Sequence, residues 1–292
     1  MKIKRLNSQC IKCLLDKYLK NIPDTINEDI KLQYMQAVLS VVASADSNLS
    51  APELTEQITL VQREVLGQET DYSGIKSHFN SLLLSLETEI ETKINQSSDS
   101  FKTALLYALS GNFIDFGAMQ SVDENKLMQT LDGAQNIKIS EAETENLRNE
   151  IKASKKLVYL TDNCGEIVLD KLFIKTIKEL NRELRVDVIV RGEAVLNDCT
   201  IEDAVEVNMY SVADVVPNGT AVAGTSLDRI SLEAKGLIDN ADVIIAKGQG
   251  NFETLRLCGK NIYYLFLCKC EMFANRFNVE RFSGMLLNDK RM

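Results

Sequence analysis

The residues of this chain that could do chemistry gather in three polar segments of its second half. They are Thr161-Asp162-Asn163-Cys164-Gly165-Glu166, Leu196-Asn197-Asp198 and Lys247-Gly248-Gln249-Gly250-Asn251. Asp and Asn side chains supply hard oxygen donors, which magnesium and manganese prefer. Asp162, Asn163 and Asp198 are therefore predicted to hold one divalent cation, Mg²⁺ or Mn²⁺. Co²⁺ and Ni²⁺ are alternatives, because affinity generally rises along the Irving–Williams series as far as copper.

The third segment has the composition of a phosphate-binding loop. Glycine lets backbone N–H groups approach an anion, and the helix start that follows adds a favourable dipole. Lys247 is predicted to neutralise phosphate charge, with the Gly248, Gly250 and Asn251 backbone as a secondary contact. A tight strand-to-helix turn with Asn251 as N-cap would explain the same residues, and Asp162 could be only an N-cap. The polar residues at several strand ends favour a binding site.

From Lys155 onward, short apolar runs alternate with amphipathic segments of helical length. This alternation is typical of parallel strands with right-handed crossover helices. The fold class predicted is α/β, a doubly wound, mainly parallel sheet of about five strands. The strands are expected at 157–160, 186–191, 214–217, 242–246 and 262–267, and the helices between them at 167–181, 200–208, 227–238 and 252–257.

Ligands of such sheets bind beyond the carboxyl ends of the strands, and the polar segments fall there. Lys269, after the fifth predicted strand, is assigned to phosphate neutralisation together with Lys247. Asn197 is predicted to contact the substrate beside Asp198. The classical G-x-G-x-x-G dinucleotide fingerprint is absent from the first turn.

Residues 8 to about 150 carry apolar residues at helical spacing, interrupted by breakers such as Pro23 and Gly67, and five to seven helices are expected. The polar segment 133–140 is the predicted junction. It divides the chain into a helical N-terminal domain, 1–150, and an α/β metal-binding domain, 151–292.

Asn112 and Asp115 interrupt an apolar segment and are predicted to reach the same cleft and contact the substrate. The alternative is a helix end whose polar side chains satisfy local backbone groups.

Composition excludes several classes of protein. The 292 residues are 45% hydrophobic and 26% charged, as in an ordinary globular protein rather than a disordered one. A net charge of −9 argues against a nucleic-acid partner and requires any anionic ligand to be held by local cations. The N-terminus lacks the apolar core of a secretory signal, and no run reaches the 18 apolar residues of a membrane helix. A cytoplasmic location, no membrane partner and free thiols are expected.

Two other motifs have ordinary explanations. His78 is the only histidine and cannot build a histidine-rich zinc site, so a surface or cap residue is expected. Cys10 and Cys13 form a CxxC pair without a second pair at zinc-finger spacing, and two half-buried thiols are the simpler interpretation.

Taken together, the polar segments resemble the metal-dependent damage-control phosphatase family, first catalogued as a domain of unknown function. The matching stretches are Thr161-Asp-Asn-Cys-Gly-Glu-Ile-Val-Leu-Asp170, Leu196-Asn-Asp-Cys-Thr200 with Asp203, and Ala246-Lys-Gly-Gln-Gly-Asn-Phe-Glu253. Gly111-Asn-Phe-Ile-Asp-Phe-Gly117 also matches, and Cys10-x-x-Cys13 resembles a feature of the stand-alone microbial branch. The resemblance covers nearly the whole chain.

The resemblance implies a helical region packed on a Rossmann-like domain, with a cation at Asp162, Asn163 and Asp198. It also implies hydrolysis of phosphate monoesters on sugars or damaged metabolites, with Asp162, Asp198 and Lys247 as catalytic residues. Phosphoryl transfer needs charge neutralisation and in-line positioning, and a metal with a lysine supplies both. Whether metal-bound water or an aspartate attacks stays open, as do the physiological substrate and the oligomeric state. Cys164, Cys268 and Cys270 depart slightly from the family pattern and bear on substrate choice.

Two rival functions belong to other classes. A methyltransferase that uses S-adenosylmethionine also has a Rossmann-like sheet, but the missing glycine-rich first turn argues against it. A metabolite-binding module without turnover would need the anion site and no metal. Phosphatase activity on a small phosphorylated metabolite is the preferred prediction.

Overall fold

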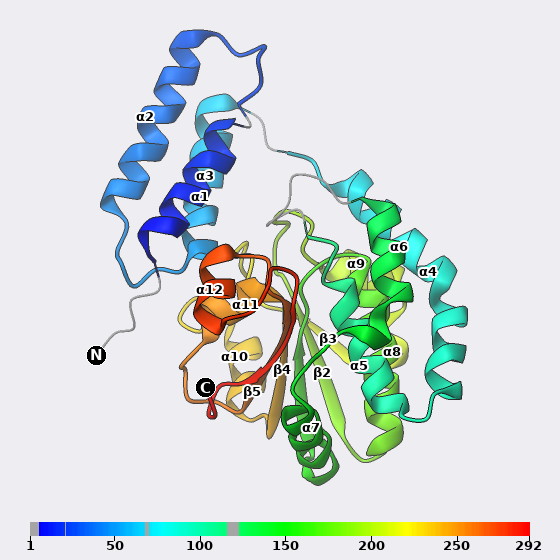
Figure 1. The fold of residues 1–292 in the computed structure, drawn as a ribbon. Helices are drawn as coiled ribbons and strands as arrows, with labels where there is room; N and C mark the ends of the chain where they lie inside the picture. The colour runs from blue at the N-terminus through cyan, green and yellow to red at the C-terminus, as the bar shows by residue number, and fades with distance from the viewer. Residues whose placement is uncertain (1–5, 21, 68–69, 116–122) are drawn as a thin grey trace.

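A six-stranded sheet lies at the centre of the computed structural model, which describes residues 6–20, 22–67, 70–115 and 123–292 (Figure 1). The strand order is β3-β2-β1-β4-β5-β6; β1 to β5 run parallel and β6 runs antiparallel to β5. The α/β class and the doubly wound, mainly parallel sheet are thus confirmed. The strands are β1 Lys156–Leu160, β2 Arg185–Val190, β3 Asp214–Pro217, β4 Val243–Lys247, β5 Ile262–Leu267 and β6 Gly284–Asn288.

Each of the five predicted strands lies within one residue of its expected limits. β4 and β5 are buried along their whole length, as short apolar runs in parallel sheets covered on both faces usually are. The prediction of about five strands needs one correction, because β6 adds a sixth at the edge. β6 pairs with β5 across the intervening helix α12 (Glu271–Phe277) rather than through a hairpin, so no local turn motif marks the pairing.

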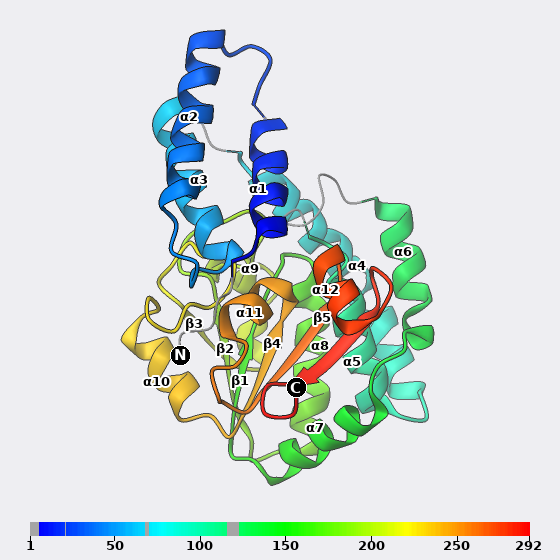
Figure 2. The ribbon, with the colours of Figure 1, turned by 60° about the vertical axis from the view of Figure 1, so that its left-hand side comes forward.

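Helices cover both faces of the sheet (Figures 1 and 2). Leu157 and Tyr159 of β1 point into a core shared with α4, α5 and α8, while Val158 and Leu160 face the core under α10, α11 and α12. The remaining bounds are α1 Ser8–Lys20, α2 Glu28–Ser44, α3 Ala51–Leu66, α4 Ser73–Gln96, α5 Ser100–Gly111, α6 Glu124–Asp132, α7 Glu141–Ala153, α8 Glu166–Leu180, α9 Ile201–Glu206, α10 Leu232–Asp239 and α11 Gly248–Leu255, with 3₁₀ turns at Ala134–Asn136 and Met209–Ser211.

Helices α1 to α3 form a separate layer with its own small core, which includes Leu14, Tyr34 and Ile58. Figures 1 and 2 show this N-terminal layer standing over one end of the sheet. In contrast, α4, α5 and α7 contribute to the main core, so residue 150 does not separate two hydrophobic cores. Helices α4, α5 and α7 therefore pack with the sheet in one core, apart from α1 to α3.

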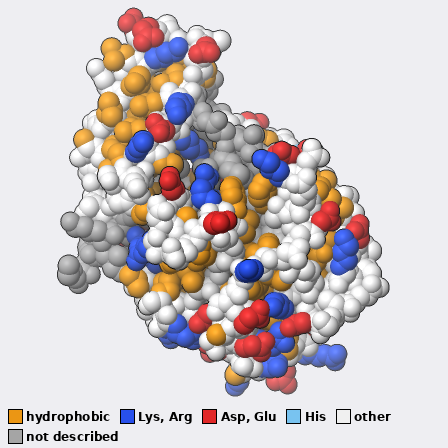
Figure 3. Space-filling model, in the orientation of Figure 1, with side chains coloured by type: hydrophobic (Ala, Val, Ile, Leu, Met, Phe, Trp, Pro, Cys, Tyr) orange, Lys and Arg blue, Asp and Glu red, His pale blue; other side chains and the backbone are white. Residues whose placement is uncertain are grey.

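Hydrogen bonds fix the N-terminal layer on the α/β body. Ser50 and Glu53 form a capping box at the start of α3, and the second oxygen of Glu53 accepts a 2.7 Å hydrogen bond from Ser226 Oγ. Arg229 also pairs with Glu56. Figure 3 shows many hydrophobic side chains on the outer surface of this layer. No helix in the described parts of the chain is both long and apolar enough to cross a membrane.

Gly165 joins β1 to α8 in a backbone conformation that requires glycine. Its φ is +67°, and an added Cβ would lie 2.9 Å from Ile114 Cδ1 and 3.0 Å from Phe79 Cβ. Its N–H also donates a 2.6 Å hydrogen bond to Asn80 Oδ1 of α4. The turn that ends the first polar segment therefore depends on close contact between α4 and the loop after β1.

We expect Gly165→Ala to lower the free energy of unfolding by about 1–3 kcal/mol, because strained backbone and steric overlap add together. Urea denaturation measures the change. Gly236→Ala is the matched control: Gly236 lies inside α10 with no neighbour near an added Cβ, so alanine there should stabilise by up to about 1 kcal/mol. Equal stability of Gly165→Ala and the wild type would contradict the packing argument.

Candidate active site at the carboxyl ends of the strands

Backbone contacts bring the three predicted cation ligands together. Asn163 and Asp198 face each other in an isolated antiparallel β-bridge between the loops that follow β1 and β2. The Cys199 N–H donates to Asp162 O at 2.8 Å, next to this bridge. Asp162, Asn163 and Asp198 are almost fully buried. The structure thus places all three predicted ligands in one cluster.

A tight turn delivers Asp198 to this cluster. The Asp198 N–H donates to Val195 O at 3.0 Å, and Leu196 has a φ of +48°, which is unusual for a branched side chain. Asn197 donates through Nδ2 to Ile114 O at 3.2 Å, which ties the turn to the segment after α5. Strained backbone of this kind persists where the surroundings fix it, often at functional sites. Asn197, predicted to contact the substrate, here fastens the turn.

Asp162 lies at the centre of a hydrogen-bonded network. Its Oδ2 accepts from Asn163 Nδ2 at 2.7 Å and from Asn112 Nδ2 at 3.0 Å. Arg191, at the end of β2, donates to Asp198 Oδ2 through Nε at 2.7 Å and approaches Asp162 Oδ1 with Nη2 at 3.4 Å. One arginine therefore holds both predicted aspartate ligands.

Lys247 occupies a buried site behind this network. Its Nζ donates to Glu166 Oε1 at 2.5 Å, to Asp170 Oδ1 at 2.6 Å and to Ala108 O at 2.8 Å. A lysine ammonium has three N–H donors, and all three are engaged. A direct contact of Lys247 with a phosphate, as predicted from the sequence, requires one of these bonds to break. In this structure Lys247 instead orients Glu166, whose other oxygen accepts from Asn163 and Asn112.

The network contains more negative than positive charge. Asp162, Glu166, Asp170 and Asp198 form what we call the buried carboxylate cluster, and among the described residues Arg191 and Lys247 are the cations bonded to it. All six side chains are more than 90% buried. Four carboxylates against two cations leave an excess of two negative charges when all are ionised.

This excess affects the acidity of the cluster. Burial, followed by repulsion from Asp198 and Glu166, raises the pKa of Asp162 well above its usual range. Burial also raises the pKa of Asp198 to about 6, although Arg191 opposes the shift. Burial raises the pKa of Asp170 to about 7 against the attraction of Lys247. A cation placed among these groups would favour their ionised forms.

The donor set for a metal combines two carboxylates with one amide. No group of three His, Cys, Asp or Glu side chains suited to a metal occurs among the described residues, so the predicted set depends on the amide oxygen of Asn163 as its third ligand. Asn163 Oδ1 and Asp198 Oδ1 accept no hydrogen bond from any described residue. These oxygens suit Mg²⁺ or Mn²⁺, which take carboxylates and amide carbonyls.

The glycines after β4 permit close packing at the site. α11 begins at Gly248, four residues before the helix expected from the sequence. Gly248 has a φ of +79°, and an added Cβ would lie 2.0 Å from Asp162 Oδ2; at Gly250 it would lie 2.1 Å from Ala223 O. Asn251 donates to Thr161 O and Lys247 O and so joins two strand ends. Gly248 thus brings the start of α11 against Asp162.

Asn112 and Asp115 lie just after α5, and the structure places Asn112 inside the network. Asn112 accepts from the Leu267 N–H at 3.0 Å while it donates to Asp162, so it joins α5, β1 and β5. Asp115 pairs with the buried Lys269 at 2.6 Å. Their roles toward a substrate stay predictions. Phe116 and Gly117, which end the matching segment, lie outside the described residues.

Sequence reasoning assigned no role to Arg191, Glu166 or Asp170. Arg191 directly follows the apolar strand β2. A cationic residue at the carboxyl end of a strand is the sequence signal that could have identified it as part of the site. Glu166 and Asp170 are four residues apart in α8 and therefore share one helix face, although α8 is otherwise apolar where it packs on the sheet. An acidic pair on a buried face needs a cation opposite it.

The remaining sequence motifs lie elsewhere. His78 makes a 3.0 Å pair with Glu124, and both side chains are about half exposed. Cys13 is exposed and Cys10 is half-buried in α1, where burial raises the pKa of Cys10 to about 11. A thiol of high pKa is a poor nucleophile.

Loss of Lys247 should destabilise the fold. Lys247→Met leaves Glu166 and Asp170 buried without their cation, and breaking a buried pair in this way costs about 3–5 kcal/mol. Lys260→Met is the control, because Lys260 forms a partly exposed pair with Asp239 and should change stability by less than about 1 kcal/mol. Urea denaturation compares the two variants; similar losses in both would contradict the charge argument.

Comparison with known proteins identifies the family of this chain. A family model, the damage-control phosphatase ARMT1-like domain, matches residues 6–284. A damage-control phosphatase of Archaeoglobus fulgidus is 33% identical over 94% of this chain and 96% of its own. A damage-control phosphatase of Pyrococcus horikoshii is 25% identical over 98% of this chain and 99% of its own. The crystal structure of a DUF89 family protein from P. horikoshii superposes with a TM-score of 0.82 over 97% of this chain and 99% of its own, at 25% identity. The chain therefore belongs to the ARMT1-like family of damage-control phosphatases.

Proposed function

We propose that this protein hydrolyses phosphate monoesters of sugar phosphates or damaged phosphometabolites with the aid of a divalent cation, Mg²⁺ or Mn²⁺. The observation that carries the proposal is the burial of four carboxylates beside two bonded cations at the carboxyl end of the sheet, which leaves an excess of two negative charges when all the groups are ionised. Uncompensated buried charge is costly, and one divalent cation would balance this excess. The names of two relatives, each a damage-control phosphatase, support phosphatase activity.

Asp162, Asn163 and Asp198 are the residues that would hold the cation. Two of their oxygens, Asn163 Oδ1 and Asp198 Oδ1, accept no bond from the described chain, and the amide group of Asn163 is already oriented by its bonds to Asp162 and Glu166. A bound divalent cation would polarise a phosphoryl oxygen and lower the pKa of a water molecule. The donor chemistry of the site therefore fits the ion.

Arg191 supplies a positive charge that the chain already holds in place. Its Nη1 is buried and has no hydrogen-bond acceptor among the described residues, although its Nε and Nη2 contact the two aspartates. A buried donor without an acceptor is unfavourable, and a phosphoryl oxygen would satisfy it. Arg191 is accordingly assigned to orient the phosphoryl group and neutralise its charge.

Lys247 is assigned a positioning role in this proposal. By holding Glu166 and Asp170 it keeps the amide groups of Asn112 and Asn163 turned toward Asp162. Preorganised polar groups of this kind lower the barrier because they need not reorganise during the reaction. Lys269 and Asp115 form a second pair at the edge of the site, and Lys269 is assigned to substrate binding.

A screen of phosphate monoesters with Mg²⁺, Mn²⁺, Co²⁺ or Ni²⁺, each compared with a chelator, tests the function. We expect hydrolysis that depends on the cation, and we expect Asp198→Asn to reduce kcat/KM by at least about 10²-fold through loss of one charged ligand. Asp228→Asn changes an exposed carboxylate outside the network and is the matched control. Phosphate binding without turnover under every condition would indicate a metabolite-binding module instead.

The cation should stabilise the protein more as the pH rises. The pKa of Asp198 is about 6 in the folded protein, above its ordinary 3.8, so protonation stabilises the cation-free fold at low pH and this contribution is lost as pH rises through about 6. A divalent cation binds the ionised carboxylate, so its stabilising effect grows over the same interval. We expect the Tm increase with Mn²⁺ to be small at pH 5 and larger at pH 7 and 8. A larger increase at pH 5 would contradict the assignment.

A further inference from the structure

Asn80 is a polar residue on the buried face of a long helix. The other buried residues of α4 are apolar, and Asn80 lies among them with no exposed surface; they are Phe79, Leu83, Ile90 and Ile94. Asparagine is unfavourable in the interior of a helix, and burial of an amide is costly unless the amide is hydrogen-bonded. Its place in α4 therefore has to be explained by the bonds that its side chain makes to other elements.

The Asn80 side chain is bonded to two segments of the α/β body. Its Oδ1 accepts the 2.6 Å hydrogen bond from the Gly165 N–H. Its Nδ2 donates to Asp203 Oδ1 at 2.9 Å and to Glu206 Oε2 at 2.7 Å. Gly165 directly precedes α8, and Asp203 and Glu206 lie in α9. One side chain of α4 thus joins the helices that follow β1 and β2.

These helices begin directly after the loops that carry the predicted cation ligands. Gly165 lies two residues after Asn163, and Thr200 lies two residues after Asp198. Asp203 caps α9, because its Oδ2 accepts from the Thr200 N–H at 2.8 Å and from Thr200 Oγ1 at 3.0 Å. Through the two helix starts, α4 is therefore bonded to both loops just beyond their ligands.

Lys76 supports the same connection one turn earlier in α4. Its Nζ lies 2.6 Å from Asp203 Oδ2 and donates to Thr200 Oγ1 at 3.3 Å. Lys76 and Asn80 are four residues apart, so they share one face of the helix. Asp203 is almost fully buried, as the carboxylates of the buried carboxylate cluster are, but it pairs with a cation of its own. The connection between α4 and α9 consequently needs no bound metal.

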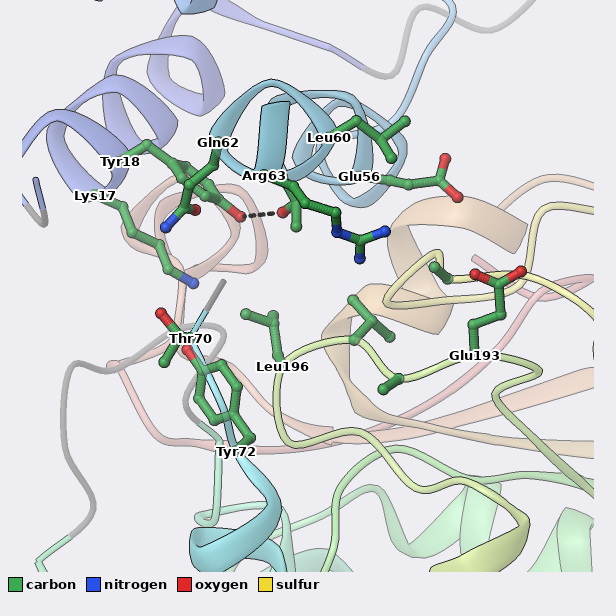
Figure 4. A pocket seen from close by; sticks show the side chains of 14 residues that line it. Lys17, Tyr18, Glu56, Leu60, Gln62, Arg63, Thr70, Tyr72, Glu193 and Leu196 are labelled. Carbon is green, nitrogen blue, oxygen red and sulfur yellow. Dashed lines mark hydrogen bonds between the residues drawn. The ribbon is translucent and has the colours of Figure 1, made fainter. Parts of the chain in front are cut away.

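The start of α4 also lies near the turn that leads to Asp198. Tyr72, the residue before α4, and Leu196, within that turn, line the same cavity of about 110 Å³ (Figure 4). Asn163 and Asp198 are themselves joined by their β-bridge. The bridge holds the two loops to each other, and the bonds from α4 hold both of them to a helix of the main core.

We propose that Asn80 is a positioning residue for the cation site. Its bonds to Gly165 and Asp203 keep the loops of Asn163 and Asp198 in a single arrangement before a cation binds. Without these bonds a cation would have to order the loops as it binds, and that ordering would lower its affinity. The inference rests on the proposed cation-dependent function and concerns how the ligands are held, not which substrate is used.

The variant Asn80→Ala removes both connections. We expect it to weaken Mn²⁺ binding, measured by titration calorimetry, by at least about tenfold, as loss of outer partners of metal ligands typically does. Asn181→Ala is the matched control, because Asn181 Nδ2 donates to Ile151 O and Ser154 O, both at 2.9 Å, near the amino ends of the strands. Asn181→Ala should leave the affinity for Mn²⁺ unchanged.

Amide hydrogen exchange of the cation-free protein gives a readout that needs no metal. Asn80→Ala should speed exchange in segments 161–166 and 196–203 by about fivefold or more, the effect of one lost hydrogen bond, while β4 and β5 keep their protection. Asn80→Asp is a second variant, used as well in case Asn80→Ala does not fold. It keeps an acceptor for the Gly165 N–H and places a carboxylate beside Asp203, so faster exchange is expected in 196–203 alone.

The outcomes separate this inference from the proposed function. Equal Mn²⁺ affinity of the wild type and Asn80→Ala, an equal loss in Asn181→Ala, or unchanged exchange in both segments would overturn the positioning role. If the wild type bound Mn²⁺ but hydrolysed no phosphate monoester, the proposed function would fail, and the affinity comparison would still decide the role of Asn80. A wild type that bound no Mn²⁺ would overturn the cation site and the positioning role together.

Discussion

Burial of four carboxylates beside two bonded cations is the constraint on which the rest of the described structure depends. Asp162, Glu166, Asp170 and Asp198 carry charge that burial alone would make prohibitively costly. The fold reduces that cost with Arg191, Lys247 and amide donors, yet it leaves the pKa values of three of the carboxylates raised. The remaining imbalance is the physical basis of the proposal that a cation binds here.

The sheet topology explains why this cluster forms where it does. β1 and β4 lie side by side at the centre of the sheet. The chain adds β2 and β3 on the outer side of β1, and β5 and β6 on the outer side of β4. The loops after β1 and β4 therefore diverge at the carboxyl edge of the sheet. Asp162 follows β1, and Lys247 and Gly248 lie at the end of β4 and the start of α11. Because Gly248 has no side chain, the start of α11 can contact Asp162 directly. The adjacent strand β2 contributes Arg191 and the turn to Asp198.

The sequence allowed much of this arrangement to be predicted, because its strongest signals are local. The apolar runs predicted the limits of β1 to β5 to within one residue. The polar residues that follow these runs predicted that Asp162, Asn163 and Asp198 lie together. The strand β6 escaped prediction because its pairing with β5 crosses a helix. The partners of Lys247 escaped because Glu166 and Asp170 follow a different strand, about 80 residues away, and only the packing of α8 on the sheet brings them together.

The N-terminal layer is packed separately from the charged centre. The residues that hold Asp162 and Asp198 are tied to the sheet and to α5, so a change among them disturbs folding as well as chemistry. Helices α1 to α3 have a small core of their own and are joined to the α/β body through Ser226 and Arg229. Because distant sites with no shared partners act nearly independently, substitutions within that small core should disturb the carboxylate cluster less than substitutions among its own bonded partners.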